Sequence, residues 1–222
     1  MTINGQDFLA PILISLKVAL ISSVLAFVFA AWAAKGMSRA RFRGRSLLET
    51  ALLLPLVLPP TVVGFILLVA LGRRSWIGEA YERLTGGPVL FTWIAAAIAA
   101  AVVAFPLAYR TIKFGFEEVD PALEDAARSA GATEWQVFRH VTAPLAARAL
   151  LAGYILGFAR ALGEFGATLM VAGNIPHRTQ TMPTAIYLAA DGGRWTLAWT
   201  WAAVMAAISL LLLLAAGRYS RR

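Results

Sequence analysis

The sequence predicts an all-α, polytopic membrane protein with about five transmembrane helices, and two observations support this fold class. Hydrophobic residues make up 59% of the 222-residue chain and charged residues only 14%, and the mean hydropathy is +0.70. A soluble domain of this length would need far more polar surface, whereas a membrane-spanning helix needs about 20 mostly apolar residues. The apolar residues gather in five stretches of suitable length, at residues 8–34, 47–71, 91–109, 145–172 and 195–216.

The basic residues between these stretches predict the orientation in the membrane. Five lie in the 35–46 loop, five in the 110–148 region and three in the tail after residue 216, which makes 13 on one side. The loops of the other side, 73–90 and 173–194, hold five. Cytoplasmic loops carry the excess of Lys and Arg. We therefore expect a multi-pass protein of the cytoplasmic (inner) membrane, with its N-terminus outside and its C-terminus in the cytoplasm.

The first apolar stretch is expected to be a retained helix. Residues 8–34 lack the small-residue cleavage site of a removed signal peptide. Lys17 interrupts the stretch and has two interpretations. Its ammonium group extends toward the membrane interface, or it helps to draw in an anion.

The composition excludes several kinds of site. The chain has no cysteine, so it has no disulfide, no cysteine-based zinc site and no thiol nucleophile. Its two histidines, His140 and His177, have no neighbours at metal-ligand spacing, so we expect no metal site. The net charge of +8 is compatible with nucleic acid, but in a membrane protein basic residues mark cytoplasmic loops. We therefore expect no nucleic-acid partner.

The second apolar stretch contains three prolines near its middle, Pro55, Pro59 and Pro60. Each proline removes a backbone donor and disturbs the carbonyl group four residues earlier. Lipid cannot satisfy such groups, so breaks of this kind occur where protein or a water-filled path covers them. The stretch is therefore either a kinked packing helix or a helix that lines a transport path.

The charged segment 120–144 predicts two short helices on the cytoplasmic side. Asp120 and Pro121 form a helix start, because a carboxylate caps the helix and proline suits its first position. Gly131 is placed to end the first helix in a left-handed conformation. Thr133 and Gln136 have the spacing of a capping box, which predicts a second helix to about Val141. Pro144 is then expected to begin the next span.

Three interpretations of this helix pair arise from the residues alone. A DNA-binding helix-turn-helix is disfavoured, because the second helix would offer Glu134, Trp135 and Gln136 first and membrane tethers it on both sides. An ordinary amphipathic surface hairpin is a second interpretation. Trp135 and Phe138 argue against this interpretation, because they would expose more apolar surface to water than a bare loop should. The groove of a soluble partner is the simplest place to bury them.

The same segment resembles the cytoplasmic signature of bacterial ABC importer permeases. That signature reads Glu-Ala-Ala, three residues, Gly, nine residues, Ile, one residue, Leu-Pro. The matching residues here are Asp125, Ala126, Ala127, Gly131, Val141, Ala143 and Pro144. The departures are Asp for Glu, Val for Ile and Ala for Leu, and the neighbouring Glu124 offers the longer carboxylate.

The resemblance covers residues 9–217 and implies the type I ABC importer transmembrane fold. It implies that segment 120–144 is a coupling helix that docks on a cytoplasmic ATPase. The docking residues implied in this chain are Glu124, Asp125, Ala126, Ala127, Gly131, Trp135, Phe138 and Pro144. The chain has no G-x-x-x-x-G-K-[ST] phosphate loop, so we expect no catalytic site and no cofactor in it. ATP and Mg²⁺ would bind the partner subunit.

The stretches "ISLKVAL", "LPLVLPPTVVGFILLVALGRR", "FARALGEFGAT" and "GNIP" are most similar to the molybdate branch of this family, with sulfate and tungstate permeases as near relatives. This resemblance implies a complex of two permease copies, two ATPase subunits and an external or periplasmic oxyanion-binding protein, surrounded by membrane lipid. It would import molybdate by alternating access. Tungstate and sulfate are alternative substrates. A secondary transporter or a membrane-assembly protein is the alternative of a different class.

The fourth apolar stretch contains two charges that share one helix face, Arg160 and Glu164. Unpaired charges at such depth cost on the order of 3 kcal/mol or more. They form either a mutual ion pair that steadies the span or part of an outer gate. The residues expected at this path or gate are Pro59, Pro60, Thr61, Arg160, Gly163, Glu164 and Gly166. Because a carboxylate repels an oxyanion, Glu164 is expected to be a gate or pairing group and not the main ligand.

Overall fold

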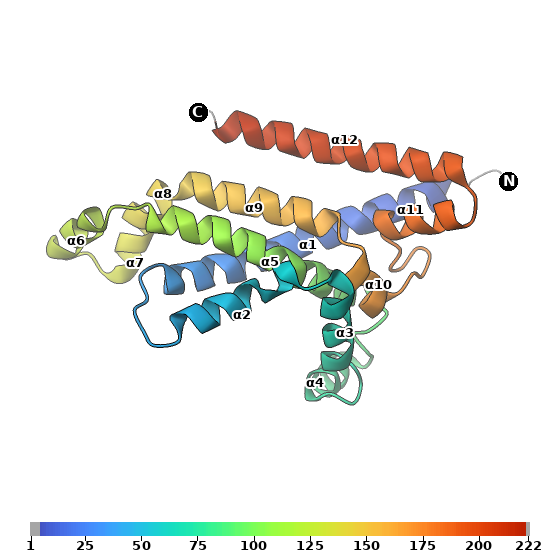
Figure 1. Ribbon diagram of the computed structural model, residues 1–222, viewed down its shortest axis with the longest axis horizontal. Coiled ribbons are helices and arrows are strands. Elements are labelled where there is room, and N and C mark those ends of the chain that lie inside the picture. The colour runs from blue at the N-terminus through green and yellow to red at the C-terminus, as the bar shows by residue number, and fades with distance from the viewer. Residues whose placement is uncertain (1–4, 221–222) are drawn as a thin grey trace.

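The computed structural model describes residues 5–220, which form an elongated bundle of α-helices without a β-strand among them (Figure 1). The long helices α1 (Gly5–Ser38), α5 (Trp93–Glu117), α9 (Ala147–Leu162) and α12 (Trp195–Ser220) run along the length of the bundle. Helices α1, α5 and α9 pack on one another, and α12 lies alongside α9. The all-α fold class is confirmed.

Small residues let α1, α5 and α9 approach closely. The buried alanines of α1 and α5 include Ala26, Ala30, Ala34, Ala95, Ala96, Ala99, Ala100, Ala104 and Ala108. In α5, a Cβ added to Gly115 would come within 2.1 Å of the Cβ of Ala149. Close backbone approach through small residues is how membrane helices gain packing energy where lipid provides no hydrophobic drive. The alanine-rich stretches are therefore packing surfaces within the bundle.

The second apolar stretch is not one straight helix, and the break lies at two of the prolines identified in the sequence. It forms α2 (Arg45–Val57) and α3 (Pro60–Ala70), which meet at an angle of 110°. A residue before proline is pushed into extended backbone. Two such residues occur in succession, Leu58 with ψ 141° and Pro59 with ψ 136°. Pro55, in contrast, lies inside α2 without breaking it.

Helix α3 leads away from the bundle into the short helix α4 (Trp76–Thr85) (Figure 1). The Oγ of Ser75 accepts a hydrogen bond from the N–H of Gly78 at 2.9 Å and begins α4. Gly86, with φ +78°, ends it. The two helices form an arm that projects sideways from the long helices.

The fourth apolar stretch is also broken. Helix α9 ends at Leu162 and α10 (Gly166–Ala172) follows after three residues. The connector after α10 contains a helix that the sequence analysis did not predict, α11 (Met182–Asp191). The sequence does contain a signal for the start of α11. Pro183 lies in its first turn, where the missing N–H has no intrahelical partner to lose.

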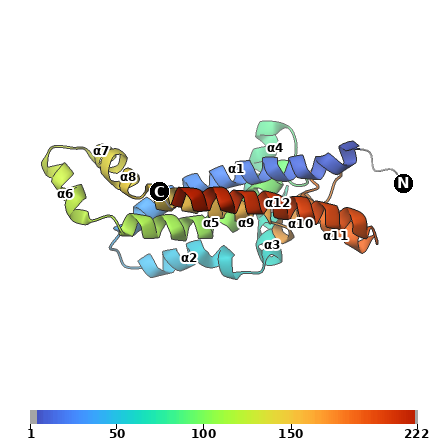
Figure 2. The same ribbon diagram turned by 90° about the horizontal axis from the view of Figure 1, so that it is seen from above.

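The described residues contain three unbroken helices that are long and apolar enough to cross a membrane, α1, α5 and α12. The count rises to five if each of two bent helix pairs is taken as one span. The Gly5 end of α1 and the C-terminal end of α12 lie at opposite ends of the bundle (Figures 1 and 2). This arrangement agrees with an odd number of crossings.

Lys17 lies on α1 beside the first residue of α5. Its Nζ is 3.7 Å from the ring centroid of Trp93, a cation–π contact. Lys35, near the end of α1, is 18 residues further along the chain, or about 27 Å along a helix, close to the thickness of a bilayer core. The position of Lys17 beside an aromatic residue at this level is typical of a membrane interface.

Candidate functional site

Segment 120–144 folds into α6 (Pro121–Ser129), α7 (Glu134–Val137), the π-helical turn η1 (Phe138–Thr142) and α8 (Ala143–Leu145). It lies at one end of the bundle, the end near the C-terminal end of α12 (Figure 1).

The predicted starts and turn of this segment are confirmed. An Oδ1 of Asp120 accepts a hydrogen bond from the N–H of Ala122 at 2.9 Å, and Gly131 has φ +89°. Both hydrogen bonds of the capping box between Thr133 and Gln136 are present. These contacts satisfy backbone donors that the first turns of the two helices would otherwise leave free.

The predicted end of the second helix is wrong. The chain does not leave the helix at Val141, because the η1 turn carries it on through α8. Pro144 lies in the first turn of α8, and the next long helix begins only at Ala147 after a bend of 74°. A π-helical turn widens the helix by one residue and has no simple sequence signature.

The outer face of the segment carries a charge cluster that joins α6 to α7. The guanidinium group of Arg128 contacts an oxygen of Asp125 at 2.7 Å and an oxygen of Glu134 at 2.7 Å. The hydrogen bond from Arg128 lowers the pKa of the Glu134 carboxyl below its ordinary value. These groups are exposed, so the cluster fixes the shape of the helix pair more than it adds stability.

The same face presents apolar and small residues. Trp135 is 66% exposed, and its ring lies 5.8 Å from that of the half-buried Phe138. The segment also has an open hollow of about 350 Å³, which is lined by Ala127, Ala130, Gly131, Ala132, Gln136, His140 and Val141. A large exposed aromatic residue and a hollow lined largely by small residues, both within one short segment, are features that a protein partner covers.

Glu124 lies beneath this outer face, and its Oε2 is 4.0 Å from the Nη2 of Arg128. Only 2% of Glu124 is exposed, whereas the side chain of Asp125 is 72% exposed. The Glu124 carboxylate accepts a hydrogen bond from the Oγ1 of Thr142 at 2.6 Å and contacts Lys35 and Arg39 at 3.4 Å each. The resemblance implied a docking role for Glu124, but its side chain points into the protein.

Burial raises the pKa of the Glu124 carboxyl, but the hydrogen bond from Thr142 and the charges of Lys35 and Arg39 outweigh it. The net pKa lies below the ordinary value, so the group is an anion at neutral pH. Thr142, Lys35 and Arg39 were missed as site residues. Lys35 is 89 positions away from Glu124 in the sequence, and nothing in the sequence joins them.

The second candidate site is the junction of the two helix breaks, which we call the break junction (Pro59, Pro60, Thr61, Arg160, Gly163, Glu164 and Gly166). The sequence predicted these residues from two separate stretches. The structure brings Gly166 of the fourth apolar stretch against Pro60 and Thr61 of the second, because α3 packs against α10. A Cβ added to Gly166 would lie 3.1 Å from the Cβ of Pro60. One turn further on, a Cβ added to Gly64 would lie 2.9 Å from the Cα of Ala167.

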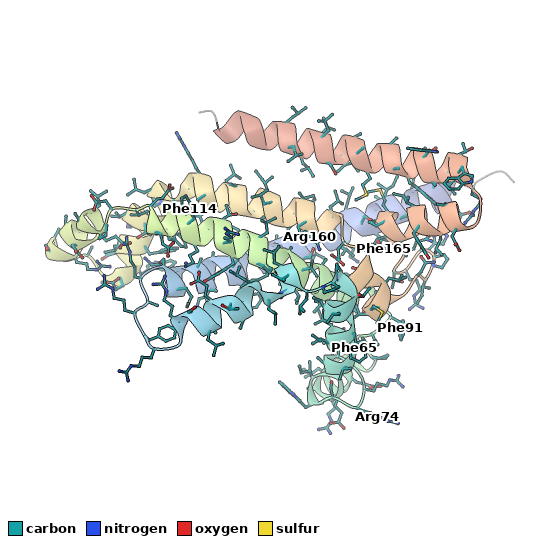
Figure 3. The ribbon with its side chains drawn as sticks, in the orientation of Figure 1. Phe65, Arg74, Phe91, Phe114, Arg160 and Phe165 are labelled. Atoms are coloured by element: carbon teal, nitrogen blue, oxygen red, sulfur yellow. The ribbon has the colours of Figure 1, made fainter. Side chains whose placement is uncertain are left out.

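Glu164 holds the break between α9 and α10. Its Oε2 lies 2.8 Å from the Nη1 of Arg160, and its Oε1 accepts a hydrogen bond from the N–H of Ala167 at 2.9 Å. Glu164 is 3% exposed, and the side chain of Arg160 is 30% exposed. Figure 3 shows Arg160 near the C-terminal end of α9 and Phe165 just beyond the break. The carboxylate thus neutralises Arg160 and satisfies a free donor of α10.

The rest of the break junction is open to its surroundings. Pro59, Pro60, Thr61 and Gly163 are exposed, and Gly166 is half-buried. A partly exposed guanidinium group beside accessible broken backbone suits brief contact with an anion, because charge-assisted donors are available without a closed pocket.

The histidines bind other groups. His140 Nδ1 lies 3.0 Å from the carbonyl oxygen of Gln136, and His177 Nε2 lies 2.8 Å from an oxygen of Asp7. Within residues 5–220, no three His, Asp or Glu side chains gather in a way that would hold a metal ion.

A family model described as "Binding-protein-dependent transport system inner membrane component" matches residues 26–222. The chain is 53% identical over 212 residues to the "Putative molybdenum transport system permease protein YvgM" of Bacillus subtilis (strain 168), covering 96% of this chain and 93% of the relative. It is 46% identical to the "Molybdenum transport system permease protein ModB" of Escherichia coli (strain K12), covering 79% and 77%. A sulfate permease of the same E. coli strain is 36% identical, covering 95% and 76%.

Solved structures share the fold at low sequence identity. One is a bacterial ABC transporter involved in the import of alginate, with a TM-score of 0.76 and 17% identity, covering 97% of this chain and 79% of that one. Another is the MetNI methionine ABC transporter in an inward-facing conformation, with a TM-score of 0.73 and 18% identity, covering 95% and 93%. At this identity the likeness establishes the fold, which is that of type I importer transmembrane subunits.

Proposed function

Because this chain belongs to the family of binding-protein-dependent transport system inner membrane components, we propose that it is the permease subunit of an ABC importer for molybdate. Two molybdenum permeases are 53% and 46% identical to it, whereas the sulfate permease is 36% identical. The substrate therefore follows the more similar branch. Molybdate, tungstate and sulfate are all tetrahedral dianions, so the external binding protein makes much of the selection among them.

The observation that carries this proposal is the outer face of segment 120–144. It offers Trp135 and a hollow lined largely by small residues, on a helix pair held in shape by Arg128 and a capping box. A soluble ATPase subunit is the partner that this surface fits, since the chain itself has no phosphate-binding loop. ATP and Mg²⁺ bind that subunit.

The docking surface consists of the exposed and half-buried members of the segment. They are Asp125, Ala126, Ala127, Gly131, Trp135, Phe138 and Pro144. Trp135 supplies the large apolar contact, and Gly131 supplies the turn that places it. Segment 120–144 lies on the cytoplasmic side, and the N-terminus lies outside, as the basic residues predict.

The transport path needs a second copy of the chain. One protomer leaves the break junction open on one side, so two facing copies complete the path, with an external oxyanion-binding protein delivering the substrate. Closure of the ATPase pair on nucleotide moves the two coupling segments, and the bundles rock between inward and outward openings. Arg160 tolerates the passing dianion, and Glu164 restrains Arg160 and holds the break.

The test is ATP hydrolysis by the complex of permease, ATPase and binding protein in liposomes, with molybdate, tungstate and sulfate compared. We expect the molybdate-loaded binding protein to stimulate hydrolysis and to be accompanied by molybdate uptake. Equal or greater stimulation by sulfate would overturn the substrate. No stimulation by any of the three would overturn the importer assignment.

A matched pair of tryptophan variants tests the docking surface. Trp135 and Trp76 are both highly exposed, but Trp76 begins α4 on the arm and Trp135 lies in segment 120–144. We expect Trp135→Ala to release the ATPase during purification and Trp76→Ala to retain it. Equal retention by both variants would place the docking surface elsewhere.

A further inference from the structure

We infer that Glu124 is a positioning residue that ties α1 to the coupling segment, so that α1 carries the movement of the segment toward the outer end of the bundle. The inference rests on the proposed ATPase docking but concerns a different surface. The tie is the Glu124 cluster, defined as Lys35, Arg39, Glu124 and Thr142.

The cluster joins parts of the chain that are distant in sequence. Lys35 lies in the last turn of α1 and Arg39 just after it, whereas Glu124 belongs to α6 and Thr142 to η1. The carboxylate bridges all three, at 2.6 Å to the Thr142 hydroxyl and 3.4 Å to each cation. One buried group therefore holds both halves of the helix pair and the end of α1 together.

Two further contacts reinforce the same connection. An Nη2 of Arg39 donates a hydrogen bond to the carbonyl oxygen of Val119 at 2.7 Å. The Nζ of Lys35 lies 5.6 Å from the ring centroid of Phe138. The segment is joined by the chain itself to α5 and α9, and these contacts add α1 as a third attached helix.

The other end of α1 is fastened to the outer helices. The indole N–H of Trp201 donates to the carbonyl oxygen of Phe8 at 3.1 Å, and the Oγ of Ser15 accepts from the N–H of Met182 at 2.6 Å. Helix α1 is 34 residues long, about 51 Å. A single continuous helix thus connects the coupling segment to α11 and to the start of α12.

Burial separates this role from docking. Because Glu124 is 2% exposed, its carboxylate is not available to a soluble partner. A change that keeps its size but removes its charge should leave the outer face of the segment intact while it weakens the hold on α1. The matched control is Glu118→Gln, the same change at an exposed carboxylate in the same region.

The experiment compares Glu124→Gln, Glu118→Gln and the unchanged permease in the complete transporter in liposomes. It measures ATPase retained on purification, and molybdate transported for each ATP hydrolysed. We expect both variants to retain the ATPase, and Glu124→Gln alone to lower the transport ratio about tenfold, within the range of coupling between distant sites. An unchanged ratio in Glu124→Gln would overturn the inference, and loss of ATPase from Glu124→Gln would assign Glu124 to docking instead.

A chemical tether provides a second test that does not depend on the stability of Glu124→Gln. The chain has no cysteine, so Lys35→Cys with Glu124→Cys introduces the only thiols of the permease. We expect this double variant to transport poorly and a flexible bifunctional maleimide across the two thiols to restore the ratio. A formed cross-link without restoration would overturn the tie. If the unchanged permease fails to retain any ATPase, the proposed function fails, and that outcome is distinct from both results.

Discussion

Two buried glutamates, Glu124 in segment 120–144 and Glu164 in the break between α9 and α10, are held by different sets of partners. Glu124 in segment 120–144 has a hydroxyl group and the two cations of Lys35 and Arg39 within 3.4 Å. Glu164 in the break between α9 and α10 has one cation, Arg160 at 2.8 Å, and one backbone N–H at 2.9 Å. Both carboxylates are almost fully buried.

The difference indicates how strongly each glutamate responds when one of its partners is lost. A carboxylate with several partners keeps its charge compensated when one contact lengthens, so Glu124 suits a permanent connection. A carboxylate with one cation depends on it entirely, because an unpaired buried charge is costly. Glu164 is therefore the more sensitive of the two to any change in its partner, because it has no second cation among the described residues to compensate its charge.

The largest expected effect comes from removing the single cation that contacts Glu164 within residues 5–220. The matched variant removes one of the two cations that lie 3.4 Å from Glu124. Arg160→Gln should lower the unfolding free energy by about 3 kcal/mol or more, because it leaves Glu164 buried without a counter-charge. Arg39→Gln should cost only about 1 kcal/mol, because Lys35 and Thr142 remain. Unfolding in mixed micelles measures both values. Equal costs would remove the distinction between the two glutamates.

A double variant sharpens the same comparison within the membrane. Glu164→Gln keeps an acceptor for the N–H of Ala167 but leaves Arg160 unpaired. We expect Glu164→Gln and Arg160→Gln each to lower molybdate uptake more than they lower membrane abundance. The double variant should lose less than the sum of the single losses, because the two side chains act as a pair. Strictly additive losses of uptake would contradict the pairing.

Backbone strain at two glycines with positive φ offers a pair of matched variants. Gly131 has φ +89° and Gly44 has φ +94°, and neither has an atom within 4 Å of an added Cβ. Valine at either position should therefore cost about 1–2 kcal/mol through the backbone alone. Only Gly131→Val should uncouple hydrolysis from molybdate uptake, because only this turn places Trp135. Wild-type coupling in Gly131→Val would contradict the docking role of the segment.

A smaller effect is expected from alanine at the break junction. In Gly166→Ala the new methyl group meets Pro60 at 3.1 Å, so α3 and α10 must separate by a few tenths of an ångström. In Gly163→Ala the nearest atoms are 3.8 and 3.9 Å away, which is ordinary contact. We expect uptake to fall in Gly166→Ala and to remain normal in Gly163→Ala. The reverse order would mean that the α3–α10 contact does not limit transport.

The smallest effect concerns pH. The pKa of Glu124 is lowered below 4.5, so its contribution to stability is complete above that value and is lost as the pH falls through the folded pKa. The difference in melting temperature between the unchanged permease and Glu124→Gln should be constant from about pH 8 to pH 5.5 and shrink below pH 4.5. A difference that already shrinks near pH 7 would contradict an ionised, well-compensated carboxylate.

Much of this fold is predictable from local sequence because the deciding forces are local. Asp120, Gly131 and the Thr133–Gln136 pair act within one turn of helix, and the structure has all three where the sequence predicts them. Prolines and glycines in the sequence indicated where the helices break, but not the direction in which the chain turns there. A double Pro-restricted backbone bends the chain by 110°, and the angle depends on what α3 packs against.

The partners of the two glutamates illustrate the same limit. Arg160 lies one turn from Glu164, so their pairing follows from helix geometry. Lys35 and Arg39 reach Glu124 only because α1 packs along α5 and ends beside segment 120–144. That contact depends on the tertiary arrangement and could not be read from the sequence. The resemblance alone therefore placed Glu124 among the docking residues.

Accessibility of a single thiol tests most directly whether segment 120–144 controls the break junction. Gly163→Cys adds a side chain at an exposed position of the cysteine-free permease. Its labelling by a membrane-impermeant maleimide from outside is measured in the complete transporter, without nucleotide and with ATP trapped on the ATPase. The account predicts a clear change in labelling rate between the two states, which Trp135→Ala abolishes. The same rate in both states of the docked complex would contradict it.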